Sequence, residues 1–484
     1  MILFLILALI ATFSGLHCAQ SHNPKGKKSA TFRGAVYEHA IQDVILDQSD
    51  LSRAGVWKAL SVNVQPLTEA ARNAKNQGAD IVVFPEYAIT GFAWSNRSHV
   101  RAVLEDIKDV GVNPCTSMPE QTIQNWLSCL AKELKMYITA NVGDLKFCNR
   151  AKDSKCPQDG AYQYNTNVVY DRNGKLVHRY HKINLYGLES HFMDYGPLGQ
   201  QNLVFKTEFG RMSSMVCFDI VMNEPAVPLT EANLVDTILF PTAWMSKFPH
   251  FLSIQYHSSW SVRHNVNLLA AETHRRKYRM TGSGLYTTTG AVRYTFDMDT
   301  ENPKLVVADL PIKPQRQVFT VPEIETPEWA EPEFKNKYYN FVKMSTPSGT
   351  VRVCKGNICC KAEYSYTEGK SENEFYALGA SYLIPYHKNG SLEICVVVKC
   401  RNGQQSGCGK FVSDTATTFT SISLSGSFSS DQVHPSASLN GLKMASGSQL
   451  DTSTVGTIKT KVNHLPIVTM VLLGRNYDAK KPNN

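Results

Sequence analysis

The sequence predicts an α/β domain, in which helices cover a β-sheet, followed by a smaller domain rich in β-strands. Two observations support this fold class. Up to about residue 300, short apolar runs alternate with stretches whose apolar residues recur at helical spacing, as in βαβ units. Beyond residue 350, short β-type runs stand among Ser, Thr and Gly. With 484 residues, 43% of them hydrophobic, the chain is long enough for two or three domains.

The elements of the first domain, which we place at residues 30–302, follow in order. The helix predicted at 63–77 ends before Gly78, a plausible C-cap. The Asn-Gly pair in 171–174 favours a hairpin, because it tolerates positive φ. The remaining predictions are strands at 30–39, 81–84, 137–142, 167–170, 175–180 and 235–240, and helices at 122–136 and 253–269.

Residues 303–350 contain repeated prolines, which predict a linker or a segment that wraps around the first domain. The C-terminal domain then spans 351–484, with strands expected at 392–398 and 467–473. Residues 411–457 are rich in Ser and Thr, but their apolar residues keep a strand-like spacing, so we predict β-structure there as well.

The N-terminus predicts the compartment. Residues 1–10 are almost entirely apolar and small residues follow, which favours a signal peptide of residues 1–19 over a membrane anchor. No later segment is apolar enough to cross a bilayer, and the polar end gives no sign of a lipid anchor. We therefore expect a secreted, extracellular protein.

The cysteine count agrees with secretion. Of 12 cysteines, Cys18 belongs to the predicted signal peptide, which leaves 11. An oxidising compartment favours disulfides over a zinc site, and the spacing leaves the pairing open. Two sequons, at Asn96 and Asn389, suit the same compartment. The cysteines form an even set of four (Cys115, Cys129, Cys148, Cys156), an even set of six (Cys354, Cys359, Cys360, Cys395, Cys400, Cys408), and Cys217 alone.

Charge and motifs argue against several classes of partner. The net charge is +8 and the basic residues are scattered, so the sequence does not predict a nucleic-acid groove. Neither a His-Glu-x-x-His motif nor another grouping with zinc-ligand spacing occurs, so we expect no metal and no cofactor.

Three reactive side chains follow predicted strands. Cys217 is the unpaired thiol, Glu86 ends the run 81–86, and Lys182 ends the run 175–182. A thiol is mostly protonated near neutral pH, so a cysteine nucleophile needs a base and a cation beside it. A thiol, a carboxylate and an ammonium at three strand ends therefore suggest a nucleophilic hydrolase.

The same segments carry a family resemblance. Phe84-Pro-Glu-Tyr87, Tyr180-His-Lys-Ile-Asn-Leu185 and Val216-Cys-Phe-Asp-Ile220 resemble the three catalytic segments of the nitrilase superfamily. More narrowly, the chain resembles the vanin and biotinidase group, strongly over residues 31–300 and more thinly beyond. The stretches that match are Ala35-Val-Tyr-Glu-His-Ala40, Leu127-Ser-Cys-Leu-Ala-Lys132, Tyr162-Gln-Tyr-Asn-Thr166, Phe240-Pro-Thr-Ala-Trp-Met245, Met280-Thr-Gly-Ser-Gly284, Ile358-Cys-Cys-Lys361, Tyr376-Ala-Leu-Gly-Ala380 and Leu392-Glu-Ile-Cys395.

The resemblance implies a four-layer α-β-β-α sandwich and assigns roles to the three residues. Cys217 would be the nucleophile, Glu86 the general base, and Lys182 the group that stabilises the tetrahedral intermediate together with the backbone N–H of Phe218. Glu189, seven residues after Lys182, would help to place the lysine and the substrate.

Other interpretations compete with these roles. A cysteine in a buried strand is usually inert packing. Taken singly, Glu86 could be a loop carboxylate and Lys182 a surface cation. A Cys–His protease could pair Cys217 with His181 or His264. A secreted binding protein that kept the fold but lost activity is the alternative of another class. The three retained residues favour an amidase over all of these.

The substrate predicted from the resemblance is a small linear amide. Residues Tyr256-His-Ser-Ser-Trp260 look like the vanin version of this region, which favours pantetheine, cleaved to pantothenate and cysteamine. The alternative is biocytin or another biotinyl amide. Trp244 is expected in the pocket wall, whereas Asn184-Leu-Tyr-Gly-Leu-Glu189 fits neither group closely and keeps the substrate open.

Overall fold

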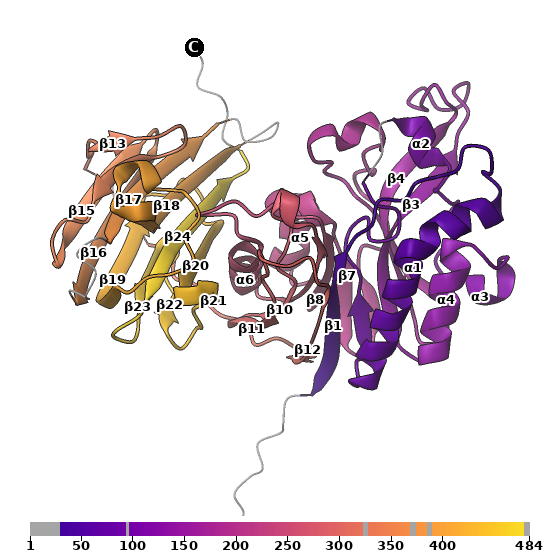
Figure 1. Cartoon of the computed structure of the whole chain (residues 1–484), viewed down its shortest axis with the longest axis horizontal. Coiled ribbons are helices and arrows are strands. Elements are labelled where there is room, and N and C mark those ends of the chain that lie inside the picture. Colours follow the sequence, from indigo (N-terminus) through magenta and orange to yellow (C-terminus); the bar gives the residue numbers. More distant parts are fainter. Residues whose placement is uncertain (1–29, 93–95, 323–327, 368–373, 385–389, 479–484) are drawn as a thin grey trace, which may run out of the picture.

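The computed structural model describes residues 30–92, 96–322, 328–367, 374–384 and 390–478. The predicted signal peptide and Asn389 lie outside these ranges. Figure 1 shows that the chain is built of successive layers: a layer of helices, two sheets packed face to face, a second layer of helices, and then a β-domain. Within the described residues, no helix combines the length and the apolar composition needed to cross a bilayer.

The first sheet has the strand order β5-β4-β3-β2-β1-β12. Strands β1, β2 and β3 are parallel, and the others pair antiparallel. Helices α1 and α4 cover its outer face, with apolar side chains from both helices in one core with the sheet. The elements are β1 (Thr31–Ala40), α1 (Arg53–Asn76), β2 (Ile81–Val83), α2 (Arg97–Arg101), α3 (Pro114–Ser117), α4 (Ile123–Leu134), β3 (Tyr137–Phe147), β4 (Ala161–Tyr170), β5 (Leu176–His181) and β12 (Lys304–Pro311).

The second sheet has the order β6-β7-β8-β9-β10-β11 and joins the first where the end of β1 pairs with the end of β9. Phe32 and Val36 of the first sheet and Leu239 and Leu269 of the second belong to the core between the two. Helix α6 covers the outer face, which completes the predicted α-β-β-α sandwich. The elements are β6 (Phe205–Thr207), β7 (Gly210–Ser214), α5 (Ala226–Glu231), β8 (Thr237–Thr242), α6 (Ser253–His264), β9 (Asn267–His274), β10 (Gly284–Thr287) and β11 (Gly290–Tyr294).

The structure corrects three sequence predictions about single elements. Helix α1 begins ten residues before the predicted start, because Ser52 caps it by accepting a hydrogen bond from the backbone N–H of Gly55. Helix α6 ends at His264, and residues 268–269 lie in β9; their apolar side chains suited either period. The Pro-rich stretch 303–350 contains β12, an edge strand that pairs with β1 and tolerates its one proline, Pro311, at its last position.

The C-terminal domain is a sandwich of two antiparallel sheets with a shared apolar core. Its larger sheet faces helix α6, so both domains contribute side chains to one core (Figure 1). The larger sheet contains β13 (Phe334–Lys335), β14 (Asn340–Lys343), β17 (Phe375–Leu383), β18 (Ser391–Cys400), β24 (Ile467–Asn476), β20 (Val433–Leu439) and β21 (Lys443–Met444); the smaller contains β15 (Ser348–Lys355), β16 (Ile358–Thr367), β19 (Thr418–Gly426), β23 (Thr457–Thr460) and β22 (Leu450–Asp451).

The disulfides form within the two predicted cysteine sets. The four N-terminal cysteines make two bridges and the six C-terminal cysteines make three, so the latter do not form a zinc site. Among the residues that the structure describes, Cys217 is the free cysteine, as the count predicted. The pairs are Cys115–Cys129, Cys148–Cys156, Cys354–Cys359, Cys360–Cys395 and Cys400–Cys408.

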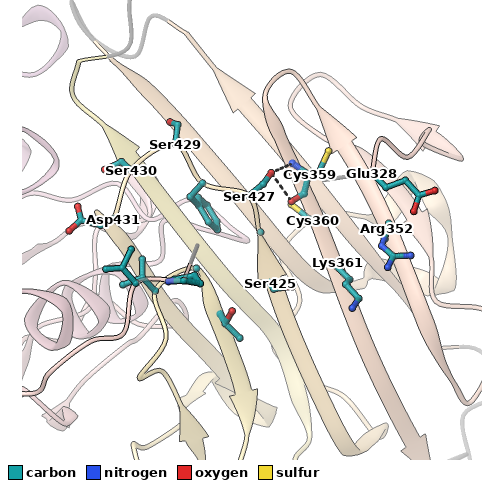
Figure 2. Close-up of a pocket in the computed structure, with 17 residues that line it drawn as sticks. Glu328, Arg352, Cys359, Cys360, Lys361, Ser425, Ser427, Ser429, Ser430 and Asp431 are labelled. Atoms are coloured by element: carbon teal, nitrogen blue, oxygen red, sulfur yellow. Dashed lines mark hydrogen bonds between the residues drawn. The ribbon is translucent and has the colours of Figure 1, made fainter. Parts of the chain in front are cut away.

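A groove of about 760 Å³ lies on the C-terminal domain (Figure 2). Its lining includes charged side chains, among them Arg352, Lys361 and Asp431, and a row of serines. None of the reactive residues predicted from the sequence lines this groove. The reactive residues lie in the sandwich instead.

Candidate active site

The three reactive residues of the sequence analysis come from three strand ends of the sandwich. Glu86 follows β2 and Lys182 follows β5, both in the first sheet, whereas Cys217 opens the 3₁₀ turn η2 (Cys217–Val221) after β7 of the second sheet. All three residues are buried, and Cys217 is only 8% exposed. The junction of the two sheets thus brings together residues that are far apart in sequence.

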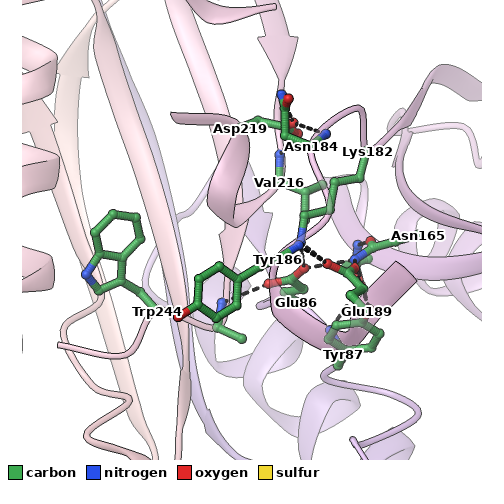
Figure 3. A network of polar contacts seen from close by, with 12 residues as sticks. Glu86, Tyr87, Asn165, Lys182, Asn184, Tyr186, Glu189, Val216, Asp219 and Trp244 are labelled. Carbon is green, nitrogen blue, oxygen red and sulfur yellow. Dashed lines mark hydrogen bonds and ion pairs between the residues drawn. The ribbon is translucent and has the colours of Figure 1, made fainter. Parts of the chain in front are cut away.

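Lys182 is the centre of the cluster. Its Nζ donates to Glu86 Oε1 at 2.8 Å and to Glu189 Oε2 at 2.8 Å. Figure 3 shows the ammonium pointing between the two carboxylates. Because a lysine has three N–H donors, this arrangement leaves one donor for a further acceptor.

Glu189 lies in the 3₁₀ turn η1 (Gly187–His191) and ties the cluster together. Its Oε1 accepts from the hydroxyl of Tyr87 at 2.6 Å and from Asn165 Nδ2 at 2.6 Å. Asn165 Nδ2 also donates to Glu86 Oε1 at 2.8 Å. The second Glu86 oxygen accepts from the backbone N–H of Ala243 at 3.1 Å. Both carboxylates are therefore hydrogen-bonded in fixed orientations, as buried charges require.

The charges of the cluster set the protonation states. Burial raises the pKa of Glu86, although the Lys182 ammonium opposes that shift. Burial would lower the pKa of Lys182, but Glu189 and Glu86 outweigh it and leave this pKa well above its usual value. Burial also raises the pKa of Glu189, and the charge of Lys182 reverses the effect and lowers it. The cluster accordingly holds one ammonium beside a carboxylate whose proton affinity is increased.

Cys217 lies within electrostatic reach of this cluster. Burial raises the pKa of its thiol well above the usual value; the Glu86 charge raises it further and the Lys182 charge lowers it. The thiol is thus protonated at rest, within the electrostatic reach of the Glu86 carboxylate. A thiol that is protonated at rest needs a general base during its attack, and the raised pKa of Glu86 suits that role.

The backbone at Cys217 is in the left-handed region, with φ of 45°. A non-glycine residue there costs about 1–3 kcal/mol and persists only when its surroundings fix it. Asp219 supplies part of that support: its Oδ2 accepts from the backbone N–H of Val216 at 3.1 Å and from the Tyr180 hydroxyl at 2.8 Å. Its Oδ1 accepts from the backbone N–H of Asn184 at 2.9 Å. One buried carboxylate therefore connects the Cys217 turn to the segment that carries Lys182.

The environment of Trp244 is mainly aromatic. Its ring stacks on Tyr256 at 5.3 Å, and its Nε1 donates to the carbonyl oxygen of Phe251 at 2.9 Å. Trp244 shares an apolar core with Cys217 and Phe218, and Phe218 directly follows the nucleophile candidate in η2. Figure 3 shows Trp244 on the far side of Tyr186 from the charged cluster. These contacts are compatible with the predicted position of Trp244 in the wall of the substrate pocket.

The histidines of the protease alternative have other partners. His181 Nε2 bonds with Asp144 Oδ2 at 2.9 Å, and the ring stacks on Tyr164. His264 Nδ1 bonds with Thr230 Oγ1 at 2.9 Å. Among the described contacts, neither imidazole therefore bonds with Cys217.

Three residues of the site were not singled out by the sequence analysis: Tyr87, Asn165 and Asp219. All three stand inside stretches that carried the resemblance, directly after Glu86, within 162–166 and two residues after Cys217. Each of the three is a polar residue in a motif that is otherwise largely apolar, and this pattern was the signal in the sequence that could have identified them. Asn96, the sequon that the structure describes, is exposed at the N-cap of α2.

Comparisons with known proteins agree with this geometry. Residues 46–264 match the carbon-nitrogen hydrolase family, and residues 330–480 match the vanin C-terminal domain. The pantetheinase of Sus scrofa is 38% identical over 94% of this chain and 90% of the relative. The chain belongs to the vanin and biotinidase group of carbon–nitrogen hydrolases. It is therefore a hydrolase of carbon–nitrogen bonds.

Further relatives fall into the two subgroups considered above. The pantetheinase of Homo sapiens is 37% identical over 94% of this chain and 90% of its own length. The biotinidase of Takifugu rubripes is 33% identical over 92% of this chain and 94% of its own. The family and the fold class predicted from the sequence are thereby confirmed.

Proposed function

We propose that the protein hydrolyses the amide bond of pantetheine, releasing pantothenate and cysteamine, with Cys217 as the nucleophile. The observation that carries the proposal is the buried Lys182 between Glu86 and Glu189, within the electrostatic reach of the free Cys217 thiol. The chain is also related to pantetheinases over nearly its whole length. In the first step, the Sγ of Cys217 attacks the amide carbonyl carbon while Glu86 takes the thiol proton.

The tetrahedral intermediate carries a negative oxygen. We assign its stabilisation to the third N–H of Lys182 and to the backbone N–H of Phe218, because donors aimed at a developing oxyanion are worth about 10²–10³ in rate each. Glu86 then gives its proton to the departing nitrogen, cysteamine leaves, and a thioester joins the pantothenoyl group to Cys217.

Hydrolysis of the thioester reverses these roles. A water molecule attacks the thioester carbonyl and loses a proton to Glu86. The C–S bond breaks, pantothenate leaves, and Glu86 returns the proton to the Cys217 thiolate. The raised pKa of Glu86 suits both directions of transfer. Glu189 and Asn165 hold Lys182 and Glu86 in place, and Trp244 forms part of the wall of the substrate pocket.

Biotinidase-like hydrolysis of biocytin is the second candidate, supported by the related biotinidase of Takifugu rubripes. Both reactions use the same thioester chemistry and differ in the acyl group that the pocket accepts. A direct comparison of the two substrates on the purified full chain separates them. We expect a kcat/KM for pantetheine at least about tenfold above that for biocytin, equivalent to about 1.4 kcal/mol. Turnover of biocytin alone would refute the proposed substrate.

The chemistry is tested by Cys217→Ser and by mass spectrometry. The variant should lose at least about 10³ in kcat, and the wild-type enzyme quenched during turnover should carry a pantothenoyl adduct on Cys217. His181→Gln is the control, because His181 precedes Lys182 but bonds with Asp144 instead of the cluster. It should retain most of the activity. Full activity of Cys217→Ser would contradict the mechanism.

We also propose that the protein is secreted, with Asn96 glycosylated. Five disulfides support an oxidising compartment, and Asn96 is exposed. Expression in a eukaryotic cell line should deliver the chain to the medium. Asn96→Gln should then lower its apparent mass by one glycan. Retention inside the cell would contradict this.

A further inference from the structure

The carbonyl end of the Cys217 turn is held by residues from outside the turn. The last carbonyl groups of a helical turn lack partners within the turn and need other donors. The hydroxyl of Tyr256, in α6, donates to the carbonyl oxygen of Ile220 at 3.3 Å. The Nε of Arg475, in β24 of the C-terminal domain, donates to the carbonyl oxygen of Val221 at 3.0 Å. The second domain thus reaches the element that carries the nucleophile candidate.

Arg475 is an unusual residue to find at this place. It is only 1% exposed, and it also donates through Nη1 to the carbonyl oxygen of Ser391 at 2.7 Å. Its guanidinium lies 4.9 Å from the centroid of the Tyr477 ring. Burial of a charged group is costly unless hydrogen bonds satisfy it. Carbonyl groups from both domains converge on this one side chain, so its position depends on the domain interface.

The turn needs support at both ends. Cys217 has a φ of 45°, a conformation that relaxes unless neighbouring structure fixes it. Asp219 holds the amino end through the backbone N–H of Val216. Arg475 holds the carbonyl end at Val221, four residues after the thiol. Without the hydrogen bond from Arg475 to Val221, the turn can rotate and carry the thiol away from Glu86 and Lys182.

We propose that Arg475 is a positioning residue, through which the C-terminal domain keeps the Cys217 thiol aligned with Glu86 and Lys182. The inference rests on the proposed role of Cys217 as the nucleophile. It gives the C-terminal domain a part in the hydrolase reaction, although that domain contributes no side chain to the charged cluster among the described contacts. Arg475 acts through the turn and does not touch the substrate.

The test compares Arg475→Met with Thr469→Val in the full-length protein. Thr469 lies on the same strand, is buried, and accepts an inter-domain hydrogen bond from Gln255 Nε2 at 2.7 Å, but it does not contact the turn. Both variants weaken the interface, and only Arg475→Met releases Val221. We expect Arg475→Met to lower kcat for pantetheine at least about tenfold with KM changed less than about twofold.

Alkylation of Cys217 by iodoacetamide gives a second readout that needs no substrate. At a temperature well below both melting points, Arg475→Met should change the alkylation rate at least about threefold, whereas Thr469→Val should match the wild type. Arg475→Lys keeps the charge and one donor toward Val221, so it should restore part of the activity. If Arg475→Met does not fold, Arg475→Lys and Tyr256→Phe provide the same two readouts.

Two results would overturn the inference. One is an Arg475→Met enzyme with wild-type kcat and wild-type alkylation. The other is a loss of activity in both variants that follows their melting temperatures. Failure of the proposed function looks different: the wild type itself would not cleave pantetheine, while the alkylation comparison would still report on the turn.

Discussion

Two regions of the molecule bury many polar side chains, and they do so in opposite ways. Around Lys182, charged groups are buried as partners: each carboxylate oxygen of Glu86 and Glu189 accepts at least one hydrogen bond. Around α6, imidazoles are buried among aromatic rings: His257 packs against Phe240 and Tyr286 of the second sheet, and His434 of β20 packs against Tyr256. In the described part of the chain, neither ring nitrogen of His257 or His434 has a hydrogen-bond partner. The first region is a network of charges, and the second is a neutral core.

The pKa directions express the same contrast. Burial lowers the pKa of His257 to about 3; it also lowers that of His434 to about 3, with Arg263 and Arg475 adding to the shift. These rings are therefore uncharged at neutral pH. In the charged cluster, by contrast, the carboxylates raise the pKa of Lys182 and keep it ionised. Buried charges are thus kept ionised where they have partners of opposite charge, whereas around α6 the protein keeps its imidazoles neutral.

The largest expected effect comes from removing the central cation. Lys182→Met leaves two buried carboxylates without their ammonium, which should lower the free energy of unfolding by about 3–5 kcal/mol at pH 7. It should also reduce kcat by at least about 10³. Denaturant unfolding should show part of the stability returning as pH falls, because the two carboxylates then take up protons. A stable variant at pH 7 would mean that the cluster does not behave as a charged network.

Glu86→Gln should affect the reaction more than the fold. The amide oxygen can still accept from Lys182 and Asn165, but the amide NH2 replaces the oxygen that accepts from the backbone N–H of Ala243. We therefore expect a modest drop in melting temperature beside the loss of the proton acceptor. We expect kcat to fall by about 10²–10⁴, measured at saturating substrate. Retained activity would remove Glu86 from the mechanism and leave it a structural member of the network.

His434→Phe tests the neutral region. The folded pKa of His434 is depressed, so the unfolded chain binds more protons; stability is complete above pH 6.5 and is lost as pH falls from 6.5 toward 3. In the variant, the free energy of unfolding should fall less between pH 6.5 and 4.5, by up to about 1.4 kcal/mol per pH unit. Denaturant unfolding at several pH values measures this difference. Parallel curves for variant and wild type would contradict the prediction. His464→Asn is the control, because His464 is exposed and its φ of 60° suits asparagine.

Glu272→Gln should give the smallest effect and sharpen the contrast with Glu86. Glu272 is fully buried in β9; its Oε1 accepts from the backbone N–H of Trp244 at 2.6 Å. Burial raises its pKa well above the usual value, and Glu38 and Glu86 add to the shift, so the group is neutral when folded. The wild type therefore loses stability as pH rises above about 4.5.

The variant removes that pH dependence and should be about 1 kcal/mol more stable than the wild type at pH 7, with less difference at pH 4. Its kcat should stay within about threefold, since Glu272 is uncharged in both forms. A large loss of activity would place Glu272 in the reacting cluster with Glu86, and equal stability at both pH values would mean that the group is ionised when folded.

Local patterns in the sequence predicted much of the sandwich. The strand preceding Glu86 and the helix capped at Thr122 were placed within a few residues, because their apolar spacing and caps are local signals. The predicted end of α6 was wrong, because the apolar residues after His264 suit a helix and a strand equally well. The pairing of β9 with β8 decides between the two. Strand β12 was also missed, because only its antiparallel pairing with β1 makes a proline-flanked run regular.

The sequence by itself determined the family, the layered α/β architecture and the identity of the thiol, carboxylate and ammonium that we assign to catalysis. An odd number of cysteines beyond the predicted signal peptide and the strand-end motifs are properties of the chain alone. Only the tertiary structure decided that Asn165, Tyr87 and Asp219 fix these groups, and that Arg475 supports the nucleophile turn from another domain. Hydrogen bonds between residues up to 254 positions apart leave no local pattern, because their geometry exists only once the two sheets and the two domains have packed together.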